Sequence, residues 1–306
     1  MRILVTGGAG FIGSHLVDAY LERGDEVAII DNLATGLKKN VNSKAKFYEV
    51  DITDKQATKN AVLDFKPEVI NHHAAHLSIR ESVEDPRFNA TVNILGFLNV
   101  MESARTNGLK KIIVASSGGA VYGDASIIPT PESYPNHPVS PYGVTKLAAE
   151  HYLHYYKSQY NIDWVAMRYS NVYGPRQNPK GETGVIATFL EQMVTDKQPI
   201  IFGDGEQTRD YVFISDVINA NLLALEKGGG PYNIGTGLET SVIEVFNLLQ
   251  NKLKTNFQKQ HGLARPGETK RSALDISAAK TGLLWEPGVK LEEGIEQTIS
   301  WYKANF

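Results

Sequence analysis

The alternation of short β-branched runs with longer helical segments is the feature that most restricts the fold of this chain. Buried strands are predicted at 3–5, 26–30, 46–50, 68–70, 111–114 and 163–168, and helical patterns separate them. Strands that alternate with helices predict a parallel sheet with helices on both faces. We therefore expect an α/β fold built on a Rossmann-type, doubly wound parallel sheet.

The pattern loosens beyond about residue 170. Glycine and proline become frequent, strands become short, and helices are predicted at 183–196, 215–226, 241–252 and 291–304. We expect residues 1–170 to form the nucleotide-binding domain and residues 171–306 to form a smaller α/β lobe, with later segments interleaved. A chain of 306 residues, 42% of them hydrophobic, is large enough for both.

Composition limits the partners and the compartment. The net charge of −3 gives no electrostatic reason to expect nucleic acid or a membrane surface as a partner, and no apolar stretch approaches the length of a membrane span. The absence of cysteine excludes disulfides and thiolate metal sites and fits a reducing compartment. We expect a soluble, cytoplasmic protein.

A glycine-rich segment follows the first predicted strand and opens a helix. Gly8, Gly10 and Gly13 fit the spacing G-x-G-x-x-G, and Gly7, Gly10 and Gly13 fit the wider G-x-x-G-x-x-G spacing. Glycine lets the backbone turn tightly and approach a phosphate, and the helix N-terminus presents unpaired N–H groups to the anion. The segment predicts a site for the pyrophosphate of a dinucleotide.

Acidic residues at the ends of the next two strands favour NAD over NADP. Asp31 lies about 20 residues after the turn, where a carboxylate accepts hydrogen bonds from ribose hydroxyls and repels a 2′-phosphate. Asp51 and Ile52 end the third strand, where we expect the adenine edge.

Three histidines in five residues end the fourth strand, in the run His72-His73-Ala74-Ala75-His76. A metal site is the alternative interpretation, but no carboxylate or cysteine cluster lies nearby in sequence to complete a ligand set. Small residues at the carboxyl end of a strand in an open α/β sheet are typical of the path of a dinucleotide. We expect Ala74 and Ala75 to contact the cofactor and expect no metal.

A serine pair, a tyrosine and a lysine form the candidate chemical site. Ser116 and Ser117 follow the fifth strand, and Tyr142 and Lys146 lie one turn apart on a predicted helix. A free tyrosine has a pKa of about 10, too high for an effective base near neutrality, and a nearby ammonium lowers it. We expect Tyr142 to remove a hydroxyl proton, Lys146 to stabilise the phenolate, and Ser117 to orient the substrate oxygen.

These motifs together resemble the extended short-chain dehydrogenases/reductases, and in particular the UDP-glucose 4-epimerases. The resemblance covers nearly the whole chain and includes the segments 6–13, 31–33, 168–176, 201–205 and 209–211 besides Tyr142 and Lys146. It implies a tightly held NAD and epimerisation at C4 of a UDP-hexose through a 4-keto intermediate. The positions that match cofactor contacts are Gly7, Gly10, Phe11, Ile12, Gly13, Asp31, Asn32, Asp51, Ile52, Asn93, Ser116, Tyr142, Lys146 and Tyr169.

The resemblance also implies the substrate contacts and the assembly. Positions that match substrate contacts are Asn171 at the diphosphate-sugar, Val185, Ile200 and Phe202 around uracil, Arg209 and Arg265 at the diphosphate, and Glu268 at the ribose. The helices near 88–106 and 141–160 match those that form a four-helix homodimer interface in the family. Their tyrosines and leucines are equally compatible with a core within one chain.

Two departures from related enzymes bear on the reaction and the sugar. Ala120 stands where 4,6-dehydratases and glucuronate decarboxylases have an acidic residue, which favours simple epimerisation. Ser272 aligns with a bulky tyrosine of strict UDP-galactose enzymes, and a small residue leaves room for an N-acetyl group, so UDP-GlcNAc and UDP-GalNAc are expected substrates beside UDP-Glc and UDP-Gal.

Two alternatives remain. A UDP-glucuronate 4-epimerase or decarboxylase would need a cation near C6, which Lys180 or Arg80 would supply. A non-catalytic NAD-binding member of the superfamily would commonly lack the Tyr142 and Lys146 pair that this chain keeps.

Overall fold

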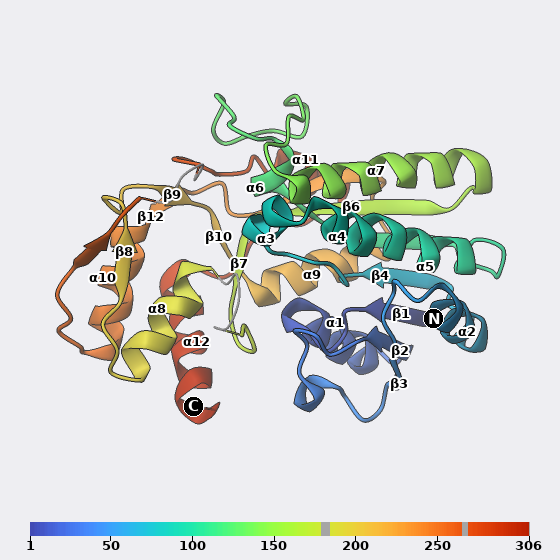
Figure 1. The fold of residues 1–306 in the computed structure, drawn as a ribbon, viewed down its shortest axis with the longest axis horizontal. Coiled ribbons are helices and arrows are strands. Elements are labelled where there is room, and N and C mark those ends of the chain that lie inside the picture. Colours follow the sequence, from blue (N-terminus) through green and yellow to red (C-terminus); the bar gives the residue numbers. More distant parts are fainter. Residues whose placement is uncertain (179–183, 265–268, 306) are drawn as a thin grey trace.

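A computed structural model describes residues 1–178, 184–264 and 269–305. Its central sheet has seven parallel strands in the order β11-β6-β5-β4-β1-β2-β3 (Figure 1). The strands are β1 (Arg2–Thr6), β2 (Glu26–Asp31), β3 (Lys46–Glu49), β4 (Val69–His72), β5 (Lys111–Ser117), β6 (Asp163–Tyr169) and β11 (Gly230–Ile234). The Rossmann-type sheet expected from the sequence is confirmed.

Helices cover both faces of the sheet, and alternate side chains of each strand enter different cores. Ile3 and Val5 pack with α1 (Phe11–Glu22), α9 (Ile214–Ala224) and α11 (Ser277–Gly282). Leu4 points to the other face, which α2 (Lys55–Phe65), α5 (Phe97–Ala104) and α7 (Pro141–Tyr160) cover. Burial on both faces explains why these strands read as continuous apolar runs.

The second half of the chain builds a smaller group of elements and also completes the sheet. Helices α8 (Val185–Val194), α10 (Val242–Leu253) and α12 (Leu291–Asn305) surround a separate apolar core beside the sheet (Figure 1). Three strand pairs accompany them: β7 (Asn171–Tyr173) with β10 (Tyr211–Phe213), β8 (Ile200–Phe202) with β13 (Gln260–Gly262), and β9 (Thr208–Arg209) with β12 (Thr240–Ser241). In contrast, β11 pairs with β6 and α9 packs on α1, so the division at residue 170 stays a prediction.

The helix expected near 88–106 is not uniform. After α3 (Ile79–Glu84), the chain forms α4 (Pro86–Ala90), a π-helical segment from Thr91 to Gly96, and then α5. A π segment carries one extra residue per turn and is a frequent feature of functional sites. Here it contains Asn93, whose side chain bonds to the loop after β4.

Short elements complete the chain, namely a 3₁₀ turn at Lys38–Asn40 and α6 (Gly118–Val121). Strand β5 runs three residues further than the sequence pattern indicates, because Ser116 and Ser117 pair in register with Arg168 and Tyr169 of β6. Within the described ranges, no helix has both the length and the apolar character needed to cross a membrane.

Candidate functional site

The candidate site lies where the order of strands in the sheet reverses. Strand β1 has β2 on one side and β4 on the other, so the connections after β1 and β4 leave in opposite directions. In open α/β sheets, ligands bind outside the carboxyl ends of the strands at such a point. The glycine turn after β1 and the segment 73–76 after β4 both lie there.

The glycine turn has no room for side chains at Gly7 and Gly13. Gly7 has a φ of +71°, and a Cβ there would lie 2.7 Å from the backbone nitrogen of Ala74. A Cβ at Gly13 would collide with the carbonyl oxygen of Gly7. Gly10 occupies the N-cap position of α1, where no side chain caps the helix. The residues therefore fit a dinucleotide, because a bare helix N-terminus and a close backbone are what a pyrophosphate requires.

The Asp31 carboxylate is fixed at the end of β2 by backbone donors. Ala9 N–H donates to one carboxylate oxygen at 3.0 Å, and Leu33 N–H donates to the other at 2.8 Å. Each oxygen keeps acceptor capacity for a ribose hydroxyl. The Asn32 side chain donates to Asp51 at 2.8 Å, which brings the two expected adenosine residues together.

The three histidines after β4 have separate partners. Nδ1 of His72 lies 2.8 Å from the Thr6 hydroxyl, Nε2 of His73 lies 3.1 Å from the Tyr169 hydroxyl, and Nε2 of His76 lies 2.7 Å from Glu81. Burial, aided by the nearby Lys146 charge, lowers the pKa of both His72 and His73 to about 3, so both rings are neutral. Among the described residues, no three His, Cys, Asp or Glu side chains lie together in a group that could hold a metal ion.

The catalytic candidates sit at the start of α7. The Ser140 hydroxyl accepts from Gly143 N–H and caps the helix, with Pro141 in its first turn. One turn on, Lys146 Nζ lies 5.6 Å from the Tyr142 ring centroid and donates to the Ala115 carbonyl of β5 at 2.8 Å. Burial lowers the pKa of Lys146 to about 8. The helix therefore holds phenol and amine beside the end of β5.

The two serines after β5 have different environments. The Ser116 hydroxyl donates to the buried Glu150 carboxylate at 2.6 Å. Ser117 ends the strand half-buried, and its side chain does not cap the following helix α6. Ser117 is thus the serine whose hydroxyl suits a substrate oxygen.

Asn93 and Tyr169, both expected to contact NAD, also have structural partners. Asn93 accepts from His76 N–H at 2.7 Å, and it donates to the His76 carbonyl and the Thr145 hydroxyl. Tyr169 accepts a hydrogen bond from Asn221, and its ring stacks on His73. Both side chains therefore contact the segment 73–76 after β4, where we expect the cofactor to pass.

The expected substrate residues lie on the smaller group of elements. Asn171 begins β7, which pairs with β10, and its N–H donates to the Asp210 carbonyl, next to Arg209 on β9. Ile200 and Phe202 share one exposed side of β8, while Ile201 between them is buried. Val185 begins α8, and Ser272 is half-buried before a bridge from Leu274 to Thr130. Arg265, Glu268 and Lys180 lie outside the described residues.

The sequence predicted no individual role for three charged residues that the structure buries. Asp210, 1% exposed, accepts hydrogen bonds from the backbone of Thr236, Gly237 and Leu274 and so fixes the loops beside Arg209. Glu150 of α7 and Arg168 of β6 form a buried ion pair between helix and sheet. The sequence signal that could have identified Glu150 is its spacing, because it follows Lys146 by one helical turn and so shares its face of the helix.

Comparison with known proteins gives the family. Residues 3–235 match the model of the NAD dependent epimerase/dehydratase family. The chain belongs to this family. The expectation of NAD as the cofactor, based on Asp31 and the glycine turn, is therefore confirmed. The protein is an enzyme of the epimerase class that its motifs resemble.

Individual members of the epimerase/dehydratase family match the chain from end to end. A putative UDP-glucose 4-epimerase of Methanocaldococcus jannaschii is 47% identical over 99% of both chains. The UDP-glucose 4-epimerase of Thermotoga maritima, crystallised with UDP-glucose, is 44% identical with a TM-score of 0.98 over 100% of this chain and 99% of that one. The Thermus thermophilus UDP-glucose 4-epimerase, in complex with NAD, is 42% identical with a TM-score of 0.95 over all of both chains.

Replacement of Gly13 by alanine tests the turn. We expect the NAD that copurifies with Gly13→Ala to fall about tenfold, a loss of about 1.4 kcal/mol, because the new Cβ forces the Gly7 carbonyl outward. NAD released by denaturation measures this. Gly229→Ala is the control, since a Cβ there meets open space; unchanged NAD content in Gly13→Ala would contradict the assignment.

Proposed function

We propose that the protein is a UDP-hexose 4-epimerase that retains one NAD through many turnovers. The observation that carries the proposal is that Lys146 lies close to Tyr142 and binds the carboxyl end of β5, where Ser117 ends the strand, at the same edge of the parallel sheet as the turn from Gly7 to Gly13. A phenol, an ammonium and a hydroxyl around one point suit the reversible oxidation of a secondary alcohol. The full-length similarity to enzymes named UDP-glucose 4-epimerase supports it.

In the proposed mechanism, Tyr142 removes the proton from O4 of the hexose while Ser117 orients that oxygen. The Lys146 ammonium stabilises the phenolate and contacts the cofactor ribose. The glycine turn and Asp31 would hold NAD, which would supply the hydride acceptor for C4 and the hydride donor to the opposite face of the 4-keto sugar. Tyr142 then gives the proton back to O4, so the reaction is redox-neutral.

The substrate is held away from the reacting carbon. We assign the diphosphate to Asn171, Arg209 and Arg265, since guanidinium groups suit phosphate oxygens. Val185, Ile200 and Phe202 are assigned to the uracil, and Glu268 to its ribose. These contacts hold the nucleotide, so most of the binding energy comes from groups away from C4. The sugar itself is free to turn and present either face of C4.

Two small residues favour neutral or N-acetylated sugars. Ala120 is buried and offers no acid or base for elimination or for chemistry at C5. Ser272 leaves space beside the sugar. For the glucuronate alternative, Arg80 is 84% exposed and pairs with Glu84, so it does not provide a cation dedicated to a carboxylate.

We also propose a homodimer through α7 and the helices from α4 to α5. Large apolar side chains lie exposed on both, namely Phe88 and Leu95 on the segment from α4 to α5 and Val144, Tyr152 and Tyr155 on α7. Patches of this kind typically mark protein interfaces. A shallow hollow of about 450 Å³ on α7, lined by Ala148, His151, Tyr152 and Tyr155, would receive side chains of the second copy.

Since the proposed reaction needs nucleotide sugars and NAD, we assign the enzyme to the cytoplasm.

Tyr142→Phe removes the phenolic oxygen, which is the proposed base, and keeps the aromatic ring. We expect NAD content to remain and kcat to fall by about 10²–10⁴-fold, the usual contribution of a positioned general base. Interconversion of UDP-Glc and UDP-Gal, followed by NMR of the products, measures this. Normal turnover of the variant would remove Tyr142 from the mechanism.

Sugar specificity is tested with three substrates, UDP-Gal, UDP-GalNAc and UDP-GlcA, each supplied without added NAD. We expect C4 epimers of the first two and no loss of CO₂ from the third. Ser272→Tyr should lower turnover of UDP-GalNAc about tenfold more than that of UDP-Gal, because the ring fills the space for the N-acetyl group. Turnover restricted to UDP-GlcA would establish the alternative function.

Val144→Glu tests the dimer. A carboxylate buried at the two-fold interface without a partner destabilises association, so we expect the mass measured by light scattering to fall from that of two chains to that of one. Leu238→Glu is the control, because Leu238 is equally apolar and 70% exposed but lies away from these helices. A wild-type protein of one-chain mass would refute the proposed dimer directly.

A further inference from the structure

The face of α7 that carries Tyr142 and Lys146 continues to Glu150, again four residues on. Glu150 is 6% exposed. One of its carboxylate oxygens accepts from the Ser116 hydroxyl at 2.6 Å and from Nε of Arg168 at 3.0 Å, and the other accepts from the second guanidinium arm at 2.6 Å. The carboxylate is therefore bound by β5 and β6 at once.

Arg168 is the other half of this arrangement. It is 2% exposed, and its remaining arm donates to the Tyr122 hydroxyl at 2.9 Å, which donates in turn to Asn233 of β11 at 2.7 Å. We call Glu150, Arg168, Ser116 and Tyr122 the Glu150 cluster. Its members come from α7, β6, β5 and the end of α6, so it joins the catalytic helix to three neighbouring elements.

The Glu150 cluster fixes the two halves of the proposed active site relative to each other. Ser116 and Arg168 are register partners across β5 and β6, and Glu150 bridges them. Ser116 immediately precedes Ser117. One helical turn from Glu150, Lys146 binds the carbonyl of Ala115 on the same strand. Two contacts one turn apart define both the position and the rotation of α7 against β5, and hence the place of Tyr142 beside Ser117.

We infer that Glu150 is a positioning residue for the epimerisation, one that holds α7 against β5 and places a fixed negative charge one helical turn from the Lys146 amine. The inference rests on the proposed function for the roles of Tyr142 and Lys146. Glu150 itself touches neither substrate nor cofactor in this scheme and acts through its neighbours.

The charges around Lys146 support the second part of this role. Among the described residues, the titratable groups that face it are the neutral His72 at the end of β4, the neutral His73 directly after it, and Tyr142 and Glu150 from α7. Burial lowers the pKa of Lys146, whereas the Glu150 charge raises it. Arg168 and Ser116 face Glu150 in turn. Without the carboxylate, Lys146 loses the anion that opposes the effect of burial, so its pKa falls further.

Glu150→Gln is the direct test, because it keeps the shape and removes the charge. We expect the alkaline limb of the kcat profile, where Lys146 loses its proton, to move down by about one pH unit. The effect should appear in kcat more than in KM. An NMR titration of the lysine Cε signals, with Lys146 assigned through Lys146→Arg, should give the same shift in the purified protein without substrate.

A second variant covers the case in which Glu150→Gln fails to fold with an unpaired buried guanidinium. Glu150→Gln combined with Arg168→Met removes both charges and retains volume, and removal of a whole ion pair is tolerated better than removal of one partner. We expect the same direction of shift, since Glu150 is the charge that acts on Lys146. Glu150→Asp, which keeps the charge on a shorter side chain, should lower kcat and leave the alkaline limb in place.

Leu153→Ala separates positioning from stability. Leu153 is fully buried on the same helix, packs in an apolar core and makes no hydrogen bond or ion pair with its side chain. We expect its melting temperature to fall with no movement of the alkaline limb. An unmoved Lys146 titration in both charge-removing variants would overturn the inference while leaving the epimerase function intact. Absence of epimerisation by the wild type would overturn the function, and the NMR titration would still test the inference.

Discussion

The close approach of the glycine turn to the backbone after β4 is the constraint on which the cofactor site depends. Gly7 adopts a left-handed conformation within van der Waals reach of Ala74, and Gly13 leaves room for the Gly7 carbonyl. That packing brings α1, β1 and β4 together at the reversal of strand order. The Asp31 carboxylate, bound by the Ala9 N–H of the same turn, is positioned as part of the same unit.

Much of this was predictable, for physical reasons that particular residues illustrate. Strands buried on both faces leave continuous apolar runs, so 26–30 and 163–168 were found to within a residue of β2 and β6. The turn was predictable because only glycine fits it. Tyr142 and Lys146 were predictable because helical spacing alone places them together.

Other features depend on tertiary contacts and leave little trace in the sequence. The π segment at 91–96 carries no distinct pattern, because it reflects how Asn93 reaches His76 and Thr145. Glu150 and Arg168 read as ordinary charged residues until the fold makes them partners, 18 positions apart in sequence. The place of β11 at the sheet edge was likewise hidden, since its pairing with β6 spans distant parts of the chain.

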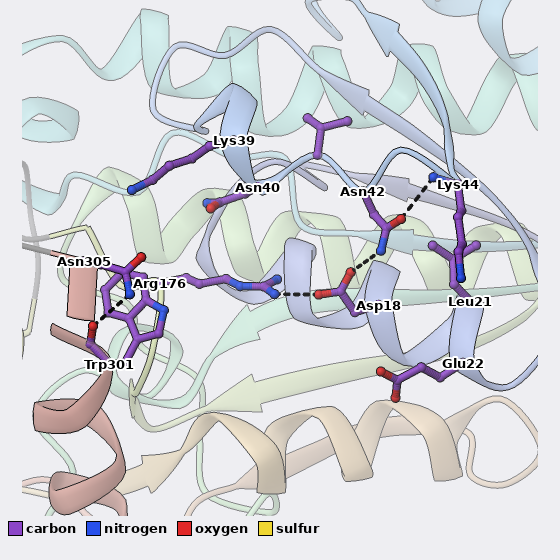
Figure 2. A pocket seen from close by; sticks show the side chains of 11 residues that line it. Asp18, Leu21, Glu22, Lys39, Asn40, Asn42, Lys44, Arg176, Trp301 and Asn305 are labelled. Atoms are coloured by element: carbon purple, nitrogen blue, oxygen red, sulfur yellow. Dashed lines mark hydrogen bonds and ion pairs between the residues drawn. The ribbon is translucent and has the colours of Figure 1, made fainter. Parts of the chain in front are cut away.

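A cleft between α1, the 3₁₀ turn and the end of α12 shows how the two groups of elements meet on the surface. In Figure 2, Arg176 extends from its position after β7 to the Asp18 carboxylate of α1, and Asn42 binds the same carboxylate. The cavity of about 550 Å³ beside them is lined by Lys39, Lys44, Trp301 and Asn305 among others. The paired charges join the smaller group of elements to the sheet domain.

The position of β11 has a consequence for biosynthesis. As the chain leaves the ribosome, β6 is complete by residue 169, but the strand that covers its open edge ends at residue 234. Asn233, whose side-chain oxygen accepts a hydrogen bond from the Tyr122 hydroxyl, belongs to that same strand. Pairings of such long sequence separation form late and slowly. The nascent first half therefore exposes an unpaired parallel edge, and the catalytic helix gains its full support only after about three-quarters of the protein has been made.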